Sequence, residues 1–251
     1  MRGMSQPLPL RPGKNSRPLS VWATAVTLAV FALTTDPLAG PPESSTAAKF
    51  LAQQTEPLTH YRAHRRMHAW TGDFDQEAWL DAWTELDENG LKFQIVSERG
   101  SEFTRNKVLK AVLKREQDLV ASGHSERATL SPENYQFTDT ATNEDGLRYV
   151  LLKPKRKDVM LVEGRMVLSP DATELLRVEG RLAKNPSFWT SWVNVIRTYG
   201  RLDGIRVPLA TESTAKVKFI GTSRLEVQYD YESINGRPVS LAARRLQASL
   251  R

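Results

Sequence analysis

Alternation of apolar and polar residues runs through the second half of the chain and predicts a series of β-strands. After Pro132 the alternating segments are separated by short runs of Asn, Asp, Gly and Pro, which are typical of tight turns. Strands at this spacing predict an antiparallel meander, either an open sheet or a barrel. The expected strands are Tyr135–Thr140, Leu147–Lys153, Val159–Leu168, Leu175–Ala183, Trp192–Gly200, Ile205–Phe219 and Arg224–Ile234.

Three further strands are expected before Pro132. Ala78–Leu86 and Leu91–Glu98 flank a turn that contains Gly90, and together they predict a hairpin. The first strand, Leu58–Trp70, has two different faces. One face carries Tyr61, Ala63 and Met67, and the other carries His60, Arg62, His64, Arg66 and His68.

The period of the apolar residues changes to about 3.6 after Gly100, which predicts an amphipathic helix. This helix is expected to begin at Glu102, to span about 18 residues and to end before Gly123. Its apolar residues are Phe103, Val108, Leu109, Val112, Leu113, Leu119 and Val120. Charged residues, Glu116 among them, fill much of the remaining surface. In a chain rich in strands, the apolar stripe of such a helix is expected to lie on a sheet.

The two faces of the predicted sheet differ in polarity. In the last strand Leu225, Val227, Tyr229 and Tyr231 share one face. Gly164 and Gly180 fall on the apolar side of their strands, where glycine indicates strong curvature or close approach. We therefore expect an α+β, mainly β fold: a strongly curved antiparallel sheet, an incomplete β-barrel, with the amphipathic helix packed on its concave face. The helix either fills this concavity or leaves an apolar cleft for a ligand.

The first forty residues have the order of a secretory signal. A basic, Pro-rich leader precedes the uncharged block Leu19–Leu33, and small residues follow near Gly40. A bilayer-spanning helix needs about 20 apolar residues, so this shorter block favours a signal cleaved near residues 39–40. An N-terminal membrane anchor is the alternative. The protein is thus expected to be periplasmic or otherwise exported.

Four segments follow from these patterns. Residues 1–40 are the signal peptide or anchor, 41–57 a linker and short helix, 58–238 a single domain, and 239–251 a flexible tail. Because the chain contains no cysteine, it has neither a disulfide framework nor an N-terminal cysteine for lipid attachment. The net charge is +6, of which +3 comes from residues 1–40. The remaining +3 gives no reason to expect nucleic acid as a partner.

The segment from Val162 to Gly236 carries a recognisable order of short motifs. A strand reading Gly-x-hydrophobic-x-Leu is followed by a Pro-Asp turn and a strand ending Val-Glu-Gly-Arg-Leu. A hairpin reading Tyr-Gly-x-x-Asp-Gly-x-x-Val-Pro comes next, and then an aromatic strand. With the leader, this order resembles the periplasmic lipoprotein-sorting proteins, the Lol carrier-like superfamily. The resemblance implies a half-barrel whose helices plug a hydrophobic cavity that holds acyl chains.

The expected function is binding or transfer of a hydrophobic ligand, namely a lipid, an acyl chain or a lipoprotein. The residues expected to line the cavity are Met166, Val178, Trp192, Leu225, Tyr229 and Tyr231. The alternative is an envelope interaction or sensor module with a filled core and no ligand. Its partner, such as an envelope membrane protein, would bind Arg62, Arg66 and Trp189.

We expect no catalytic residues, metal or cofactor. His60, His64 and His68 follow one another at intervals of four, but on a strand such residues lie about 13 Å apart, too far to share one zinc ion. His124 and Ser125 form a close pair without a nucleophile-elbow pattern. The acids Glu77, Asp81 and Glu85 share a face with Trp79 and Trp83, as expected for the solvent side of a hairpin.

Overall fold

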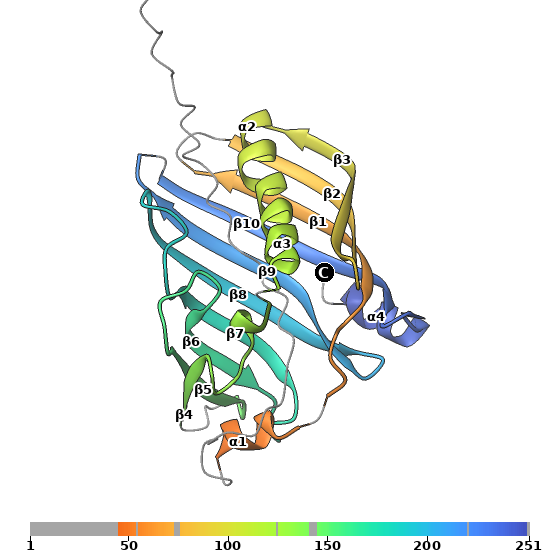
Figure 1. Cartoon of the computed structure of the whole chain (residues 1–251), viewed down its shortest axis with the longest axis vertical. Helices are drawn as coiled ribbons and strands as arrows, with labels where there is room; N and C mark the ends of the chain where they lie inside the picture. The colour runs from red at the N-terminus through yellow and green to blue at the C-terminus, as the bar shows by residue number, and fades with distance from the viewer. Residues whose placement is uncertain are drawn as a thin grey trace, which may run out of the picture.

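The computed structural model describes residues 45–249 except 54, 73–75, 124, 141–144 and 220, so the predicted signal peptide lies outside the described residues. One antiparallel sheet contains all the described strands, in the order β3-β2-β1-β10-β9-β8-β7-β6-β5-β4, with β11 paired to β10 (Figure 1). The sheet does not close into a barrel. The expected fold class, mainly β with a helix packed on a curved sheet, is confirmed.

The strands match those expected from the alternation, with ends that shift by a few residues. They are β1 Tyr61–Thr71, β2 Gln76–Asp87, β3 Gly90–Gly100, β4 Tyr135–Asp139, β5 Arg148–Pro154, β6 Val162–Leu168, β7 Leu175–Leu182, β8 Thr190–Leu202, β9 Ile205–Val217, β10 Gly221–Ile234 and β11 Arg237–Pro238. The helices are α1 Thr46–Leu51, α2 Glu102–Thr104, α3 Lys110–Ala121 and α4 Leu241–Ser249, with a π-helical turn at Arg105–Leu109 and a 3-10 turn at Ser125–Ala128. In the described part of the chain, none of the helices has the length and apolarity needed to cross a membrane.

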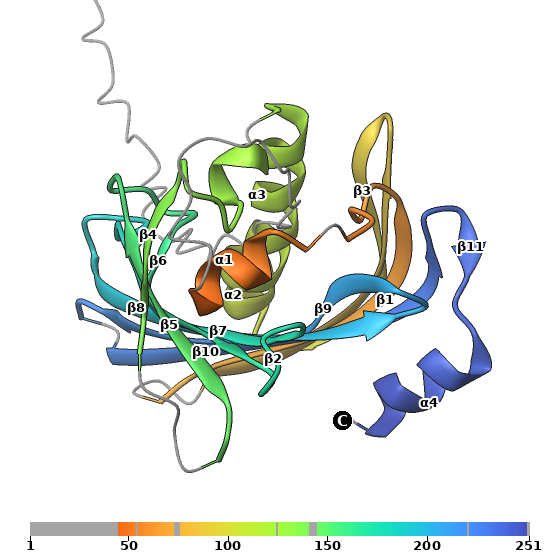
Figure 2. The same ribbon diagram turned by 90° about the horizontal axis from the view of Figure 1, so that it is seen from below.

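The position of the helix on the concave face follows from the strand order. Strands β3 and β4 are consecutive in the chain but lie at opposite edges of the sheet. The connection 101–134 must therefore cross the sheet, and its apolar stripe can be buried only against the sheet's apolar face. Figure 2 shows α3 lying in the hollow of the curved sheet, with α4 on the other side.

Two glycines allow β6 and β7 to approach each other closely. Gly164 and Gly180 are directly opposite in the register of these strands. A Cβ atom on Gly164 would lie 2.1 Å from the carbonyl oxygen of Glu179, which is far closer than any real contact. The sequence-based expectation of close approach at these glycines is confirmed.

Both chain ends of the described domain are fastened to the sheet. The predicted short helix is present as α1, whose Ala47 amide donates to the Asp139 carboxylate at 3.1 Å. Within the segment 239–251, which was expected to be a flexible tail, residues Leu241–Ser249 form α4, which is docked on β10. The Oε1 atom of Gln247 accepts from the Tyr231 amide at 2.7 Å. Pairing between β9 and β10 ends at Gln228, so the Gln247 amide group takes the place of a strand partner.

We expect Gly164→Ala to destabilise the domain severely, by more than about 2 kcal/mol, because the added methyl group meets fixed backbone rather than a flexible side chain. Gly72→Ala is the matched control. A Cβ at Gly72 lies 4.0 Å from its nearest neighbour, and we expect a change within about 0.5 kcal/mol. Urea unfolding of both variants tests this, and equal midpoints would contradict the steric argument.

Candidate ligand-binding site

A buried arginine lies on the concave face of the sheet. Arg65 follows Tyr61 and Ala63 on the inward side of β1, and only 1% of its surface is exposed. The sequence interpretation placed the basic residues of this strand on the outer face and missed Arg65. Strict alternation was the available signal, since position 65 has the same parity as the apolar residues on either side of it.

The partner of Arg65 is Glu116 on α3, which is 2% exposed. The Nη1 atom donates to Oε2 at 2.5 Å and the Nη2 atom donates to Oε1 at 3.0 Å, which makes the pair bidentate. Nη2 also donates to the hydroxyl of Tyr61 at 2.5 Å. The guanidinium carbon lies 4.8 Å from the ring centre of Tyr229. Charge-assisted bonds of this bidentate kind hold the helix in one position on β1.

The charge of Arg65 is maintained despite its burial. Desolvation, the largest single effect, lowers the pKa of the guanidinium, but the charge and hydrogen bond of Glu116 together with Tyr61 and Tyr229 outweigh it and raise the pKa well above its usual value. Because the pair carries no net charge, the helix brings its counter-ion with it when it packs on the sheet.

Tyrosines surround this ion pair and give the concave face a partly polar centre. The rings of Tyr61 and Tyr231 meet edge to face at 5.7 Å, and Tyr229 stacks with Tyr231 at 6.2 Å. The Tyr231 hydroxyl donates to the Pro208 carbonyl at 3.0 Å. Burial raises the pKa of all three phenols above the usual value, so they remain protonated hydrogen-bond donors.

Glu116 belongs to the buried stripe of the helix. Leu109, Val112, Leu113 and Glu116 have the spacing i, i+3, i+4, i+7 that defines one helical face. All four are buried, the first three completely. The sequence interpretation assigned Glu116 to the exposed charges, and the structure corrects this. The helical period was the signal that could have identified it.

The start of this helical segment is anchored to the sheet. The Ser101 amide donates to the Glu77 carbonyl at 2.8 Å, and the Ser101 hydroxyl accepts from the Thr104 amide at 3.3 Å. The π-helical turn Arg105–Leu109 follows directly. Further along, the Gln117 side chain donates to the Leu91 carbonyl at 2.9 Å and joins α3 to β3.

Five of the six residues predicted to line the cavity belong to one hydrophobic core: Met166, Val178, Leu225, Tyr229 and Tyr231. Each of the five is less than 7% exposed. The sixth, Trp192, is partly exposed and is not part of that core, because a bulge near Thr190 places it on the opposite face from the fully buried Val193. The structure places the five in one hydrophobic cluster that also contains Leu109, Val112 and Leu113 of the crossing segment.

A pocket of about 300 Å³ lies at the carboxyl end of α3. Leu119, Val159 and Met160 give it apolar walls. At its rim the buried carboxylate of Asp158 accepts a hydrogen bond from Arg127 at 2.7 Å. Burial by itself raises the pKa of Asp158, but the bond from the Met160 amide and the Arg127 charge lower it below its usual value. The pocket combines apolar walls with an ionised rim.

The basic face of β1 lies on the convex side, where acidic residues neutralise it. Arg62 Nε donates to Glu232 at 2.5 Å, and Arg62 Nη1 lies 3.7 Å from Glu85. Arg66 pairs with Asp230 at 3.1 Å. The two arginines predicted to bind a partner therefore belong to a ladder of cross-strand ion pairs rather than to an isolated basic patch.

The histidines of β1 and His60, which directly precedes this strand, contact separate partners. His68 stacks on Trp79 and lies 2.6 Å from a Glu77 oxygen, whereas His60 reaches Glu88 at 3.2 Å. No group of three or more His, Cys, Asp or Glu side chains that could bind a metal occurs among the described residues. The other catalytic candidate, His124, lies outside those residues.

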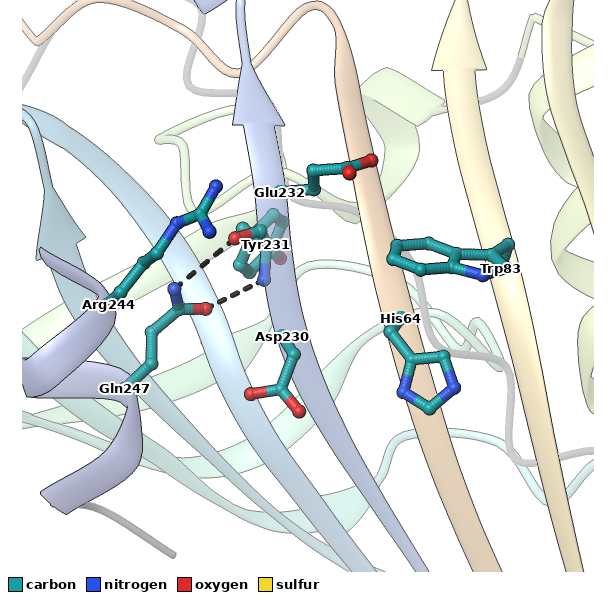
Figure 3. Close-up of a pocket in the computed structure, with 7 residues that line it drawn as sticks. All are labelled: His64, Trp83, Asp230, Tyr231, Glu232, Arg244 and Gln247. Carbon is teal, nitrogen blue, oxygen red and sulfur yellow. Dashed lines mark hydrogen bonds between the residues drawn. The ribbon is translucent and has the colours of Figure 1, made fainter. Parts of the chain in front are cut away.

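Another pocket, of about 260 Å³, separates the convex face from α4 (Figure 3). His64 and Trp83 form one wall, with their ring centres 5.2 Å apart. Asp230, Glu232 and Arg244 bring charged groups to the other side. This pocket has charged groups around aromatic rings, whereas the concave face is lined mainly by buried apolar side chains.

Comparison with known proteins adds little to this picture. No protein-family model matches the sequence, and no curated protein is significantly similar to it. A crystal structure of a DUF1329 family protein from Desulfovibrio piger aligns with a TM-score of 0.35 and 10% identity, covering 74% of this chain and 88% of that chain. A similarity of this degree supports no argument about function.

We expect Glu116→Ala to cost about 3–5 kcal/mol of unfolding free energy, because it leaves the Arg65 charge buried without its partner. The double substitution Arg65→Met with Glu116→Leu should recover most of this loss, since it removes both charges and keeps the volume. The control is Lys114→Ala, which breaks an exposed pair with Asp118 on the same helix and should cost less than about 0.5 kcal/mol. Additive effects of the two core substitutions would contradict the coupling.

A second prediction concerns alkaline pH. Burial raises the pKa of Tyr135 to about 12, whereas a phenol in the unfolded chain titrates near pH 10. The unfolded state therefore loses its proton first, and the stabilising contribution is lost as the pH rises from about 10 to about 12. Above pH 10, the unfolding free energy of the wild type should fall faster than that of Tyr135→Phe, by up to about 1.4 kcal/mol per pH unit. Equal slopes in urea unfolding would exclude this role.

Proposed function

We propose that this protein is an exported, non-enzymatic envelope protein that binds a hydrophobic ligand, a lipid or an acyl chain, between α3 and the concave face. The observation that supports the proposal is the position of the crossing segment 101–134, which we call the cover. The crossing segment, held at its centre by the ion pair between Arg65 and Glu116, covers a curved face that is lined mainly by apolar side chains.

The chemistry of the covered face supports an acyl chain as the ligand. Met166, Val178 and Leu225 contribute aliphatic side chains to the core cluster to which α3 also belongs. Each methylene group that moves from water to such a surface contributes about 0.8 kcal/mol. A long acyl chain can therefore replace the apolar contacts that α3 gives up when it moves away.

The polar anchor supports a cover that opens. A buried ion pair adds little net stability compared with apolar residues of the same volume, because both charges lose hydration on burial. When α3 leaves the sheet, Arg65 and Glu116 regain water, and this offsets part of the cost of opening. The π-helical turn before α3 provides a place for the movement to start, since such turns occur often at functional sites.

Uptake of a fluorescent fatty acid, competed by unlabelled phospholipid, is the direct test. We expect saturable binding at one site and the release of co-purified lipid in native mass spectrometry of protein extracted from membranes. Hydrogen exchange of Lys110–Ala121 should change on binding. Folded wild-type protein that carries no lipid and takes up no probe would refute the proposal.

The variant Arg65→Met with Glu116→Leu sharpens this test. It keeps the interior filled but removes the two charges that regain water when α3 leaves the sheet. Opening therefore becomes more costly, and we expect slower ligand exchange at preserved folding. Lys114→Ala on the exposed side of the same helix is the matched control and should exchange ligand at the wild-type rate. An unchanged exchange rate in the double variant would show that the ion pair does not gate the site.

A second candidate function is an envelope interaction module with a filled core. The complete burial of Leu109, Val112 and Leu113 favours it, because these side chains already occupy the concavity. In this case the working surface would be the convex face around Arg62 and Arg66. The two functions are separated by the uptake experiment, in which the filled core takes up no probe.

A further inference from the structure

Two neighbouring loops at one end of the sheet expose a cluster of aromatic rings. Phe188, between β7 and β8, is 79% exposed, and Phe219, between β9 and β10, is 83% exposed. Trp189 lies between them, with its ring centre 5.6 Å from that of Phe188 and 5.9 Å from that of Phe219. We call these three residues together with Lys218 the aromatic tip. It lies at the upper left of Figure 1, where β9 and β10 join.

The tip is held in place by contacts between its two loops. The Lys218 amide donates to the Trp189 carbonyl at 2.8 Å, and the Lys218 ammonium lies 4.3 Å from the ring centre of Phe188. Trp189 also packs against the hydrophobic core. Phe219 has a φ of 67°, a left-handed conformation that costs a non-glycine residue about 1–2 kcal/mol. A bulky apolar residue is thus held outward at a position where glycine would be more stable.

The chemistry of the tip matches the interface of a bilayer. Single exposed apolar residues are common, but a cluster of them marks a surface for interaction. Segments 181–192 and 213–223 contain Arg181, Lys184, Lys216 and Lys218 and no acidic residue. Aromatic rings with adjacent basic side chains are favoured at the headgroup level of membranes, and positive charge attracts anionic lipids.

We propose that the aromatic tip inserts into the headgroup region of a bilayer that contains anionic lipids, with Phe188 and Phe219 reaching the acyl boundary. This role goes beyond the proposed function, because it requires no ligand on the concave face. The strand registers place Ser223, Thr71 and Gln76 in one row across three strands. The β2–β3 register places Ala78 opposite Gly100, so the helical cover begins at this same end of the sheet.

Single labelling sites test the insertion directly, because the chain has no cysteine of its own. Phe188→Cys and Phe219→Cys, each carrying an environment-sensitive fluorophore, are compared in full-length protein with Val96→Cys on β3. Val96 is 56% exposed and serves as the control. On vesicles of phosphatidylglycerol and phosphatidylethanolamine with a quencher below the headgroups, the first two labels should be quenched and the third should not. Vesicle-bound protein with all three labels in water would overturn the proposal.

The energetic test combines Phe188→Ser with Phe219→Gly. We expect partitioning into the same vesicles to fall at least about tenfold, while the unfolding midpoint stays equal or rises because glycine accepts the left-handed φ. The leader is present in both proteins, so the ratio reports the tip. Equal partitioning would overturn the proposal. The proposal would also be overturned if the protein bound native membranes, lost this binding after protease treatment of those membranes, and did not bind pure lipid. That result would indicate a protein partner instead.

Fatty-acid uptake separates this proposal from the proposed function. The variant with the altered tip should take up the fatty-acid probe as the wild type does. Failure of uptake in both proteins with label quenching intact would count against the ligand site alone. Intact uptake with labels that remain in water would count against the tip alone.

Discussion

The architecture depends on one constraint: strands that are consecutive in the chain, β3 and β4, lie at opposite edges of the sheet. The connection between them has to cross the sheet, and the concave side is where its apolar residues find partners. This crossing supplies a core without a second sheet. It also means that the interior is covered by one segment of about thirty residues, together with the short helix α1, rather than by a rigid layer.

The ion pair between Arg65 and Glu116 determines where this segment lies. Apolar contacts alone would allow a helix to slide or rotate on a curved sheet with little change in energy. A bidentate pair has one favourable geometry, and separating its charges inside the core costs several kcal/mol. The same pair loses much of this advantage when both partners reach water. The ion pair therefore selects one closed position of the helix but adds little net stability to that position. This property suits a cover that has to open.

The convex face of the sheet and the aromatic tip have different chemical characters. The convex side of β1, β2 and β10 is occupied by paired charges such as Arg62 with Glu232, so it is polar and nearly neutral. The aromatic tip combines exposed rings with unbalanced positive charge. A basic strand face suggested a partner surface from the sequence, but the acids that neutralise it come from β2 and from β10, which is far away in the chain. From the sequence, Trp189 was the one residue of the tip expected at a partner surface. Phe219 joins it through the β8–β9 pairing.

Candidate-site residues were accessible to sequence analysis to different degrees. Met166, Val178 and Leu225 were identified as interior because alternation with period two reports which side of a strand a residue occupies. Arg65 and Glu116 also have interior positions in their periodic patterns, but their charge favoured an exposed interpretation. The burial of Arg65 or of Glu116 can be expected only when the opposite charge is known to lie on the facing element. The docking of α4 was missed for a related reason, since Gln247 fills a gap left where β9 stops pairing with β10.

Local pattern was therefore sufficient for the strands, the crossing helix and the polarity of each face, because these depend on neighbours within a few residues. The order of the strands, the pairing of β1 with β10 and the meeting of Arg65 with Glu116 depended on the tertiary structure. Each of these joins residues far apart in the chain, and the energy of such a contact depends on what the rest of the fold places opposite it.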